Sequence, residues 1–332
     1  MAQVPQTTGA VGGDQLPELQ ATVAGPLAEV EARLGQLAVG MPEQLRTVTG
    51  GLLHAGKRLR PLVVLLVAGA SPPAKASAVA LATAVEEVHV ASLIHDDIID
   101  GAERRRGRPS APAALGQRCA VLAGDYLAAA AYQQVMAADV PDAPEALIEA
   151  VVRMTLAEVQ ELATTGRLLP EAEHLEIISG KTAALFEVSA YLGGLAAGLP
   201  RDDLEGLRRY GAALGMAFQI RDDLLDLYGE SGDLGKPVRT DLAEGVYTLP
   251  VIAAAGALGG QTVRERLEQL QAGEGNGHLA AETATLTRHL GGQAYATERM
   301  EQYAQDALAP LPDLPARPHL EALARYAVRR SV

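Results

Sequence analysis

Apolar residues recur along most of this chain with the spacing of α-helices. From about residue 17 to residue 330, segments of roughly 12 to 25 residues carry Ala, Leu and Val at positions i, i+3, i+4 and i+7. Ala80, Ala84, Val88 and Ala91 form one such face. No convincing run of alternating strand residues interrupts the pattern. The Gly and Pro residues predict breaks at 50–51, 71–73, 107–109, 141–144, 169–170, 198–200 and 229–237.

The pattern predicts one large helical bundle. Residues 1–16 are polar and Gly-rich without periodicity, which is typical of a mobile tail. Residues 17–332 are expected to form a single all-helical domain. Residues 259–278 are polar and are predicted to be a surface loop that flanks a last helical pair.

Composition narrows the class of protein. Of the 332 residues, 48% are hydrophobic, 21% are charged and only 3% are aromatic, a balance that excludes a disordered chain and favours helices over sheets. The net charge of -13 argues against a nucleic-acid-binding surface. A single cysteine, Cys119, excludes an internal disulfide.

The sequence does not predict a membrane protein. The longest apolar stretch, residues 61–74, is shorter than the roughly 20 residues that span a bilayer, and we expect it to be a buried helix. The first two dozen residues contain no Lys or Arg and no compact apolar run, unlike a signal peptide. Cytoplasmic residence is therefore the default expectation.

Two acidic clusters stand inside apolar helical segments. Asp96, Asp97 and Asp100 share the DDxxD spacing with Asp222, Asp223 and Asp226. The first and last Asp of each cluster lie on one helix face, where two carboxylates repel by about 3 kcal/mol at an effective dielectric near 20. One cluster alone is often a solvated helix face, but two copies in apolar helices predict bound cations. All-oxygen ligands suit Mg²⁺, which is commonly shared with substrate phosphates.

The few lysines gather near the same segments. Three of the four stand in Gly56-Lys57-Arg58-Leu59-Arg60-Pro61, Lys181-Thr182 and Gly235-Lys236-Pro237, and residues 104–106 are three consecutive arginines. Each group alone is consistent with surface ion pairs. Together, in an acidic chain, they indicate a metal and phosphate site.

The ordered motifs resemble those of the trans-isoprenyl diphosphate synthases of the polyprenyl synthetase family, over about residues 50 to 250. The matching segments are GKRLRP at 56–61, HDDIID at 95–100, RRG at 105–107, GDYL at 124–127, KT at 181–182, FQIRDD at 218–223 and DLAEGVYTLP at 241–250. The resemblance implies an all-α, single-domain helical bundle around a deep central cavity, of the isoprenoid synthase type, and a homodimer.

The resemblance also implies the reaction and the residues that carry it. Isopentenyl diphosphate would be condensed head to tail with an allylic diphosphate, with about three Mg²⁺ ions on the allylic diphosphate. The implied metal ligands are Asp96, Asp100 and Asp222, supported by Asp97, Asp223 and Asp226. The implied diphosphate contacts are Lys181, Lys236 and Arg105; the implied isopentenyl site is Lys57, Arg60, His89 and Arg106; Thr182 and Gln219 match positions near the reacting carbons.

Two positions need separate mention. His89 precedes Asp96 by seven residues, two helical turns on the same face, which raises it above an ordinary structural histidine. Val246 stands where the family usually carries Lys, so one expected cation is absent, and Arg239 is a candidate to compensate.

The residues one turn before Asp96 predict the product length. Short-chain members of the family tend to carry aromatic rings there, whereas this chain has Ala91 and Ser92. Val88 and Ala84 continue that face, and residues 127–131 offer further small side chains. Small side chains at these positions leave room for a long hydrocarbon chain, so we expect a geranylgeranyl or longer product.

Three other readings compete. A class I terpene cyclase also uses an aspartate-rich metal site but has no need of an isopentenyl pocket. A di-iron carboxylate protein is suggested by the Glu-x-x-His patterns at 86–89 and 171–174, although Pro170 puts the second at a helix start. A non-catalytic regulatory subunit typically loses one aspartate motif, and this chain keeps both.

Overall fold

A computed structural model describes residues 15–69, 72–105, 107–229, 238–273 and 277–330. Residues 1–14 of the tail predicted at 1–16 and most of the predicted break at 229–237 lie outside the described residues, as do Arg106 and Lys236. Leu16, the last residue of the predicted tail, is instead the buried first residue of a helix.

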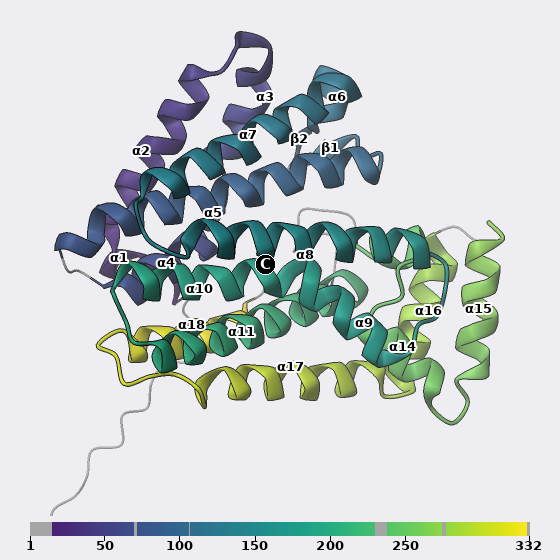
Figure 1. The fold of residues 1–332 in the computed structure, drawn as a ribbon. Helices are drawn as coiled ribbons and strands as arrows, with labels where there is room; N and C mark the ends of the chain where they lie inside the picture. The colour runs from purple at the N-terminus through teal and green to yellow at the C-terminus, as the bar shows by residue number, and fades with distance from the viewer. Residues whose placement is uncertain (1–14, 70–71, 106, 230–237, 274–276, 331–332) are drawn as a thin grey trace, which may run out of the picture.

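The described chain is almost entirely helical, as the apolar periodicity predicts (Figure 1). The helices of the first half are α1 (Leu16–Thr22), α2 (Ala24–Gly40), α3 (Glu43–Leu53), α4 (Leu59–Ala68), α5 (Pro72–Ile99), α6 (Ala111–Leu115), α7 (Gln117–Ala137) and α8 (Ala143–Thr164). The second half comprises α9 (Glu171–Ile178), the π-helical turn η1 (Ser179–Ala183), α10 (Ala184–Ala196), α11 (Arg201–Tyr228), α13 (Thr240–Glu244), α14 (Leu249–Gly256), α15 (Gln261–Gln271), α16 (Gly277–His289), α17 (Gly292–Leu308) and α18 (Arg317–Arg329).

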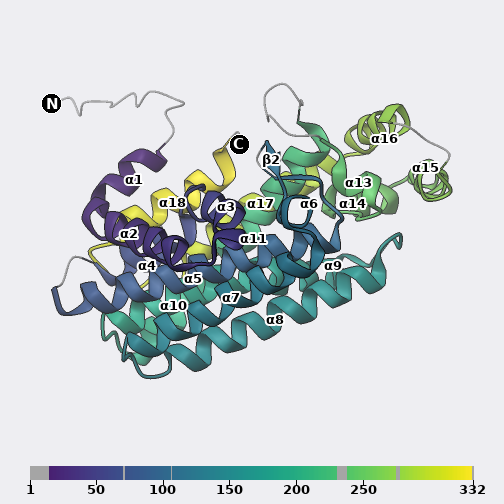
Figure 2. The ribbon, with the colours of Figure 1, turned by 90° about the horizontal axis from the view of Figure 1, so that it is seen from above.

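The main core is formed by buried apolar residues of several packed helices, among them α4, α5, α7, α8, α10 and α11. Ala80, Ala84, Val88 and Ala91 on α5 are all buried, as their spacing predicts. Figure 2 shows α5, α7, α8 and α10 running alongside one another, while α13 to α16 gather at one end of the molecule. That end has a smaller core of its own, built around Val251, Val263 and Ala280.

The helix α5 contributes a long apolar stretch to the chain. From Lys75 to Ile99 it is long and apolar enough to cross a membrane, and it is the one such helix among the described residues. Most of it is buried inside the protein, as in the core helix of a globular fold. The predicted buried helix within residues 61–74 corresponds to α4, which ends at Ala68.

Two boundaries predicted from the sequence are wrong. Gly50 and Gly51 do not break the chain but lie inside α3, where a Cβ at Gly51 would come within 3.0 Å of Arg108 Nη1. Residues 261–271 form α15 rather than a loop, because Val263 and Leu267 lie one turn apart and are both buried. A polar average over residues 259–278 conceals this apolar face.

The predicted break at 107–109 is a hairpin turn. Arg104–Arg105 (β1) pairs antiparallel with Arg108–Pro109 (β2), the only strands in the part of the chain that the structure describes. This hairpin follows α5 directly and carries Arg105 back toward the end of that helix.

Candidate active site

The two acidic motifs reach one cavity from different helices. Asp96 on α5 and Asp222 on α11 both line a cavity of about 670 Å³. Their neighbours Asp100 and Asp226 also lie on the same side of the protein, since both raise the pKa of Glu244, although burial is the larger cause. The placement of two acidic helix faces beside one pocket is the arrangement that the repeated DDxxD spacing predicts.

Predicted cationic residues line the same cavity. They come from the loop before α4, from α4, from α5, from the hairpin and from η1: Lys57, Arg60, His89, Arg105 and Lys181. Thr182, Gln219 and Ser92 are further predicted residues of its wall.

Among the described residues, Asp100 and the three supporting aspartates lie outside the lining of this cavity. Asp97 is fully buried and accepts a hydrogen bond from Arg105 Nε at 2.7 Å. Asp226 accepts hydrogen bonds from Thr240 Oγ1 at 2.7 Å and from the backbone of Asp241, and so fixes the start of α13. Asp100 lies just beyond the end of α5 and is exposed.

Burial changes the acidity of the carboxyl groups. Burial, with Glu158 and Asp100 nearby, raises the pKa of Asp96 to about 7 despite the opposing charge of Lys181. Burial also raises the pKa of Asp223 to about 8, although Gln219 Nε2 donates to its Oδ1 at 2.8 Å. Among the described residues, no three His, Cys, Asp or Glu side chains form a ready-made metal cluster.

A chain of hydrogen bonds connects η1 with α11. Thr182 Oγ1 donates to Gln219 Oε1 at 2.7 Å, and Gln219 in turn is held by Asp223. Asp223 therefore orients the amide of Gln219, so that the two residues predicted near the reacting carbons stand together.

Lys181 is held by two glutamates that the sequence analysis did not select. Its Nζ lies 2.9 Å from Glu158 and is also paired with Glu161, both on α8. Burial lowers the pKa of Lys181, but the two carboxylates outweigh it and the net shift is upward. The i, i+3 spacing of the two glutamates on a predicted helix is visible in the sequence, but it does not show that Lys181 is their partner.

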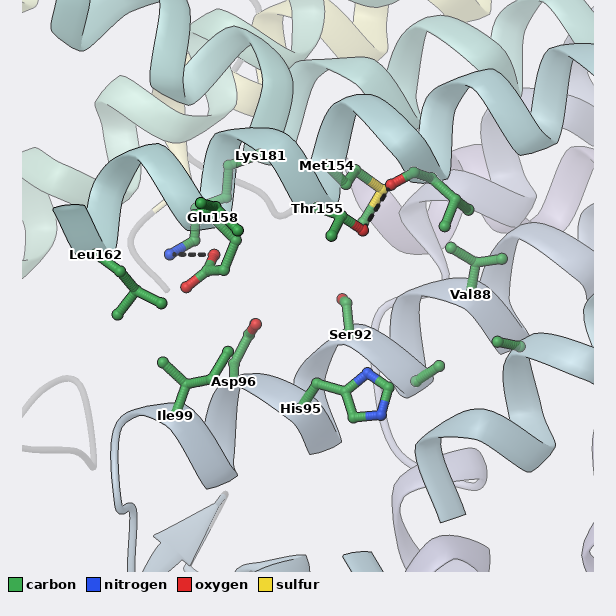
Figure 3. A pocket seen from close by; sticks show the side chains of 14 residues that line it. Val88, Ser92, His95, Asp96, Ile99, Met154, Thr155, Glu158, Leu162 and Lys181 are labelled. Carbon is green, nitrogen blue, oxygen red and sulfur yellow. Dashed lines mark hydrogen bonds and ion pairs between the residues drawn. The ribbon is translucent and has the colours of Figure 1, made fainter. Parts of the chain in front are cut away.

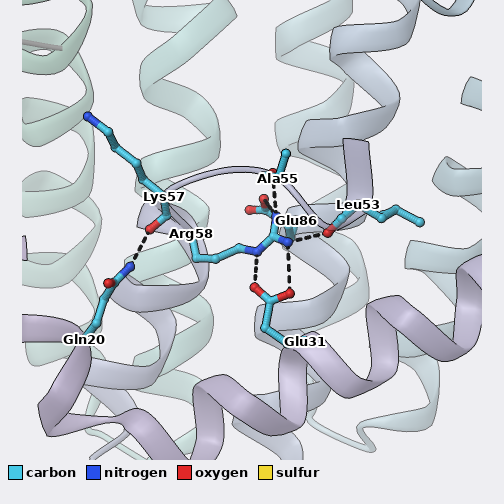
Figure 4. A network of polar contacts seen from close by, with 7 residues as sticks. All are labelled: Gln20, Glu31, Leu53, Ala55, Lys57, Arg58 and Glu86. Atoms are coloured by element: carbon cyan, nitrogen blue, oxygen red, sulfur yellow. Dashed lines mark hydrogen bonds and ion pairs between the residues drawn. The ribbon is translucent and has the colours of Figure 1, made fainter. Parts of the chain in front are cut away.

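The loop before α4 is fixed by Arg58 (Figure 4). Arg58 adopts a left-handed conformation, with φ of 53°, and its buried guanidinium pairs with Glu31 and with Glu86 Oε1 at 2.7 Å. This anchor presents the neighbouring Lys57 and Arg60 to the cavity. The pairing also removes Glu86 from the metal ligands that a di-iron protein would require.

Arg60 and Arg330 stack on a pair of aromatic rings. The Arg60 guanidinium lies 4.7 Å from the centroid of Phe186, and that of Arg330 lies 3.8 Å from Phe218. Burial lowers the pKa of Arg60 to about 10, so it stays charged at neutral pH. Arg330 Nη2 also donates to Asp222 Oδ1 at 2.7 Å, which the sequence gave no reason to expect.

A second, apolar cavity of about 370 Å³ opens beside Asp96 (Figure 3). Val88, Ala91 and Ser92 on α5 line it together with Ala128 on α7. The ring of His95 forms part of its wall and lies against Gly124, where a Cβ would come within 2.2 Å of Nε2. The glycine of the GDYL segment therefore leaves room for the His95 ring between α5 and α7.

Comparison with known proteins identifies the family of the chain. The family model of polyprenyl synthetase matches residues 42–281. The chain belongs to the polyprenyl synthetase family. It is 37% identical to the nonaprenyl diphosphate synthase of Mycobacterium tuberculosis over 316 residues, which cover 91% of this chain and 94% of that protein.

Solved structures show the same fold. The decaprenyl diphosphate synthase of Rhodobacter capsulatus superposes with a TM-score of 0.86 at 34% identity, covering 96% of this chain and 99% of that one. A polyprenyl synthase of Caulobacter crescentus, complexed with calcium and isoprenyl diphosphate, superposes with a TM-score of 0.84 at 32% identity, covering 99% and 100%. This polyprenyl synthetase is a trans-prenyltransferase that joins isoprenoid diphosphates head to tail.

Proposed function

We propose that this polyprenyl synthetase is a Mg²⁺-dependent enzyme that makes a long polyprenyl diphosphate. The observation that carries the proposal is the pair of adjoining cavities, one lined by charged groups and the other by small apolar side chains. A diphosphate fits the first cavity by charge, and a growing hydrocarbon chain fits the second.

The residues present fit a divalent cation of the Mg²⁺ type. Asp96 and Asp100 supply carboxylate oxygens from the end of α5 and the turn after it, and Asp222 supplies them from α11. The chain's single cysteine, Cys119, does not line the cavity. Mg²⁺ typically binds one or two carboxylates and completes its coordination with water and substrate phosphates, so it does not need a preassembled cluster. When bound, such ions would stabilise the negative charge that develops on the leaving diphosphate.

The protein's own cations complete the allylic diphosphate site in this proposal. Lys181 on η1 and Arg105 on the hairpin both line the cavity, and each is held by a carboxylate, Glu158 for the first and Asp97 for the second. Held in this way, their charges need little reorganisation as negative charge develops. Lys236, which lies outside the described residues, is assigned to the same group by resemblance.

Isopentenyl diphosphate would bind at Lys57, Arg60 and His89, with Arg106 assigned by resemblance. Arg60 is half-buried, and its buried Nε has no hydrogen-bond partner among the described groups. An anionic ligand would supply that partner. A terpene cyclase needs no such second anion site, so this cluster favours prenyl transfer.

The oxygen dipoles of Thr182 and Gln219 would stabilise the allylic cation as its carbon–oxygen bond breaks. The double bond of isopentenyl diphosphate then attacks that cation, and loss of a proton regenerates an allylic diphosphate one unit longer. Asp97, Asp223 and Asp226 act indirectly, by fixing Arg105, Gln219 and α13.

The deciding experiment supplies purified protein with Mg²⁺, labelled isopentenyl diphosphate and each allylic primer, and then sizes the dephosphorylated products. We expect products beyond farnesyl. Ala91→Phe should shorten them by filling the apolar cavity, and an unchanged product would place the length control elsewhere. Asp96→Ala and Asp222→Ala should abolish most turnover while helix content, measured by circular dichroism, is retained. Normal turnover in either would remove that residue from the metal site.

A homodimer is also proposed. Large apolar side chains are exposed in rows on two neighbouring helices, which we call the α7/α8 face: Val121, Leu122, Tyr126, Met136, Ile148, Val152, Leu156, Val159 and Leu162. Exposed apolar rows on neighbouring helices are typical of a protein interface. A second copy of this chain fits, because a symmetric dimer pairs the same patch with itself.

A further inference from the structure

The charged cavity and the apolar cavity meet at four residues. Ser92, Asp96, Met154 and Lys181 line both. Asp96 and Lys181 carry the charges of the diphosphate site. Ser92 and Met154 are the two uncharged members, so the passage from one cavity to the other runs between them.

The side chains on the two sides of this passage differ in conformational freedom. The hydroxyl of Ser92 donates to the backbone carbonyl of His89 at 2.9 Å, within the same helix, and its small side chain is therefore fixed. Met154 comes from α8 and is partly buried against the main core. Figure 3 shows Ser92 and Met154 on facing sides of the pocket, with Asp96 and Lys181 to one side and Val88 to the other.

A methionine side chain is suited to a cavity wall that has to change shape. Its unbranched thioether has three rotatable bonds and changes shape at little cost. A diphosphate held near Asp96 and Lys181 would direct its hydrocarbon tail toward Val88 and Ala91, and the tail has to pass Met154 to arrive there.

We propose that Met154 is a specificity-determining residue, the adjustable aperture through which the growing chain enters the apolar cavity. The inference rests on the proposed function. It differs from the prediction made for Ala91 because Met154 acts at the entrance rather than at the floor. It predicts that the side chain at 154 affects long primers and leaves the shortest ones alone.

The experiment compares kcat/KM for two primers in Met154→Phe and Met154→Ala. The first primer is the shortest allylic diphosphate that the parent extends, whose tail ends before the passage. The second is geranylgeranyl diphosphate, whose tail has to pass it. We expect Met154→Phe to keep the short primer within about twofold of the parent and to lose at least about tenfold with the long primer, in the range of hydrophobic pocket discrimination. The product distribution should shift to shorter chains.

Met154→Ala is expected to retain the long primer and to give products at least as long as those of the parent. Val39→Phe is the control, because Val39 is 71% exposed on α2, lies outside the α7/α8 face and lines neither cavity. It should leave both primers and the product length unchanged.

Equal changes in kcat/KM for both primers would contradict the proposal that Met154 forms an aperture. Unchanged product lengths in both Met154 variants would contradict it as well. Failure of the proposed function looks different, since the parent itself would then extend no primer. If the parent and all of the variants make the same long products, only the role of Met154 is refuted.

Discussion

Glu87 is fully buried in α5, and neither of its carboxylate oxygens has a hydrogen-bond partner among the described residues. Burial raises the pKa of this carboxyl to about 8, despite the opposing charge of Arg33. In the unfolded chain the group would titrate near its ordinary value, about 4.3. Between those two pH values the unfolded chain loses a proton that the folded protein keeps, so stability falls as pH rises, by up to roughly 1.4 kcal/mol per pH unit.

Glu87→Gln should remove this slope because glutamine does not ionise. We expect the variant to gain stability relative to the parent as pH rises from 5 to about 8, as measured by urea unfolding at several pH values. Glu268→Gln, on the exposed surface of α15, is the control and should track the parent. A stability difference between Glu87→Gln and the parent that does not vary with pH would contradict the assignment.

Arg330 pairs with the carboxylate of Asp222, which the proposed function assigns to a metal cation. Its side chain is only 5% exposed, and it pairs with Asp222, whose side chain is 36% exposed. Arg330→Gln should free that oxygen and remove a nearby positive charge. We expect Mn²⁺ to bind several-fold more tightly in the presence of inorganic pyrophosphate, as measured by isothermal titration calorimetry.

Arg329→Gln makes the same charge change at an exposed neighbouring position and serves as the control. Equal Mn²⁺ affinity in both variants would show that the Arg330 and Asp222 pair does not compete with cations. The same pair shows why sequence could not reveal this contact: the two residues are 108 positions apart, and no local pattern connects them.

At the scale of elements, periodicity predicted the helices whose apolar faces are continuous, such as α4 and α5. It failed where the deciding contact is tertiary. Gly50 and Gly51 were predicted to break the chain because glycine is a poor helix former, yet α3 continues through them with Thr49 and Leu53 fully buried. The acidic and cationic motifs indicated the charged residues of the site, while Glu158 and Met154 on α8 gave no recognisable signal of their place beside it.

The π-helical turn η1 depends on one close approach. A Cβ on Gly180 would come within 2.6 Å of Ala157 Cβ and 3.1 Å of the Arg153 carbonyl, both on α8. Gly180→Ala should therefore push η1 away from α8 and move Lys181 relative to its glutamates. We expect a loss of about 1–3 kcal/mol in the free energy of unfolding and a lower kcat/KM for the allylic primer.

Gly25→Ala is the matched control, since Gly25 lies in α2 with no atom within 4 Å of an added Cβ. It should be neutral or slightly stabilising in urea unfolding, because alanine favours the helix. Parent-like stability and kcat/KM in Gly180→Ala would mean that η1 tolerates displacement.

At the scale of the whole molecule, the α7/α8 face continues into the apolar cavity. Val159 and Leu162 belong to this face and also line that cavity, so the outer wall of the cavity is exposed in the single chain. A second copy packed on the face would cover this wall and exclude water from it.

Leu156→Glu tests this arrangement, because Leu156 is 63% exposed at the middle of the α8 row and lies outside both proposed site cavities. A charge at this position would have to be buried without a partner in a symmetric dimer. We expect the parent to sediment as a dimer and the variant as a folded monomer that releases shorter products. Leu258→Glu, at a fully exposed position away from α7 and α8, should remain dimeric. A monomeric parent, or a dimeric Leu156→Glu variant with unchanged products, would show that another contact or none at all covers this face.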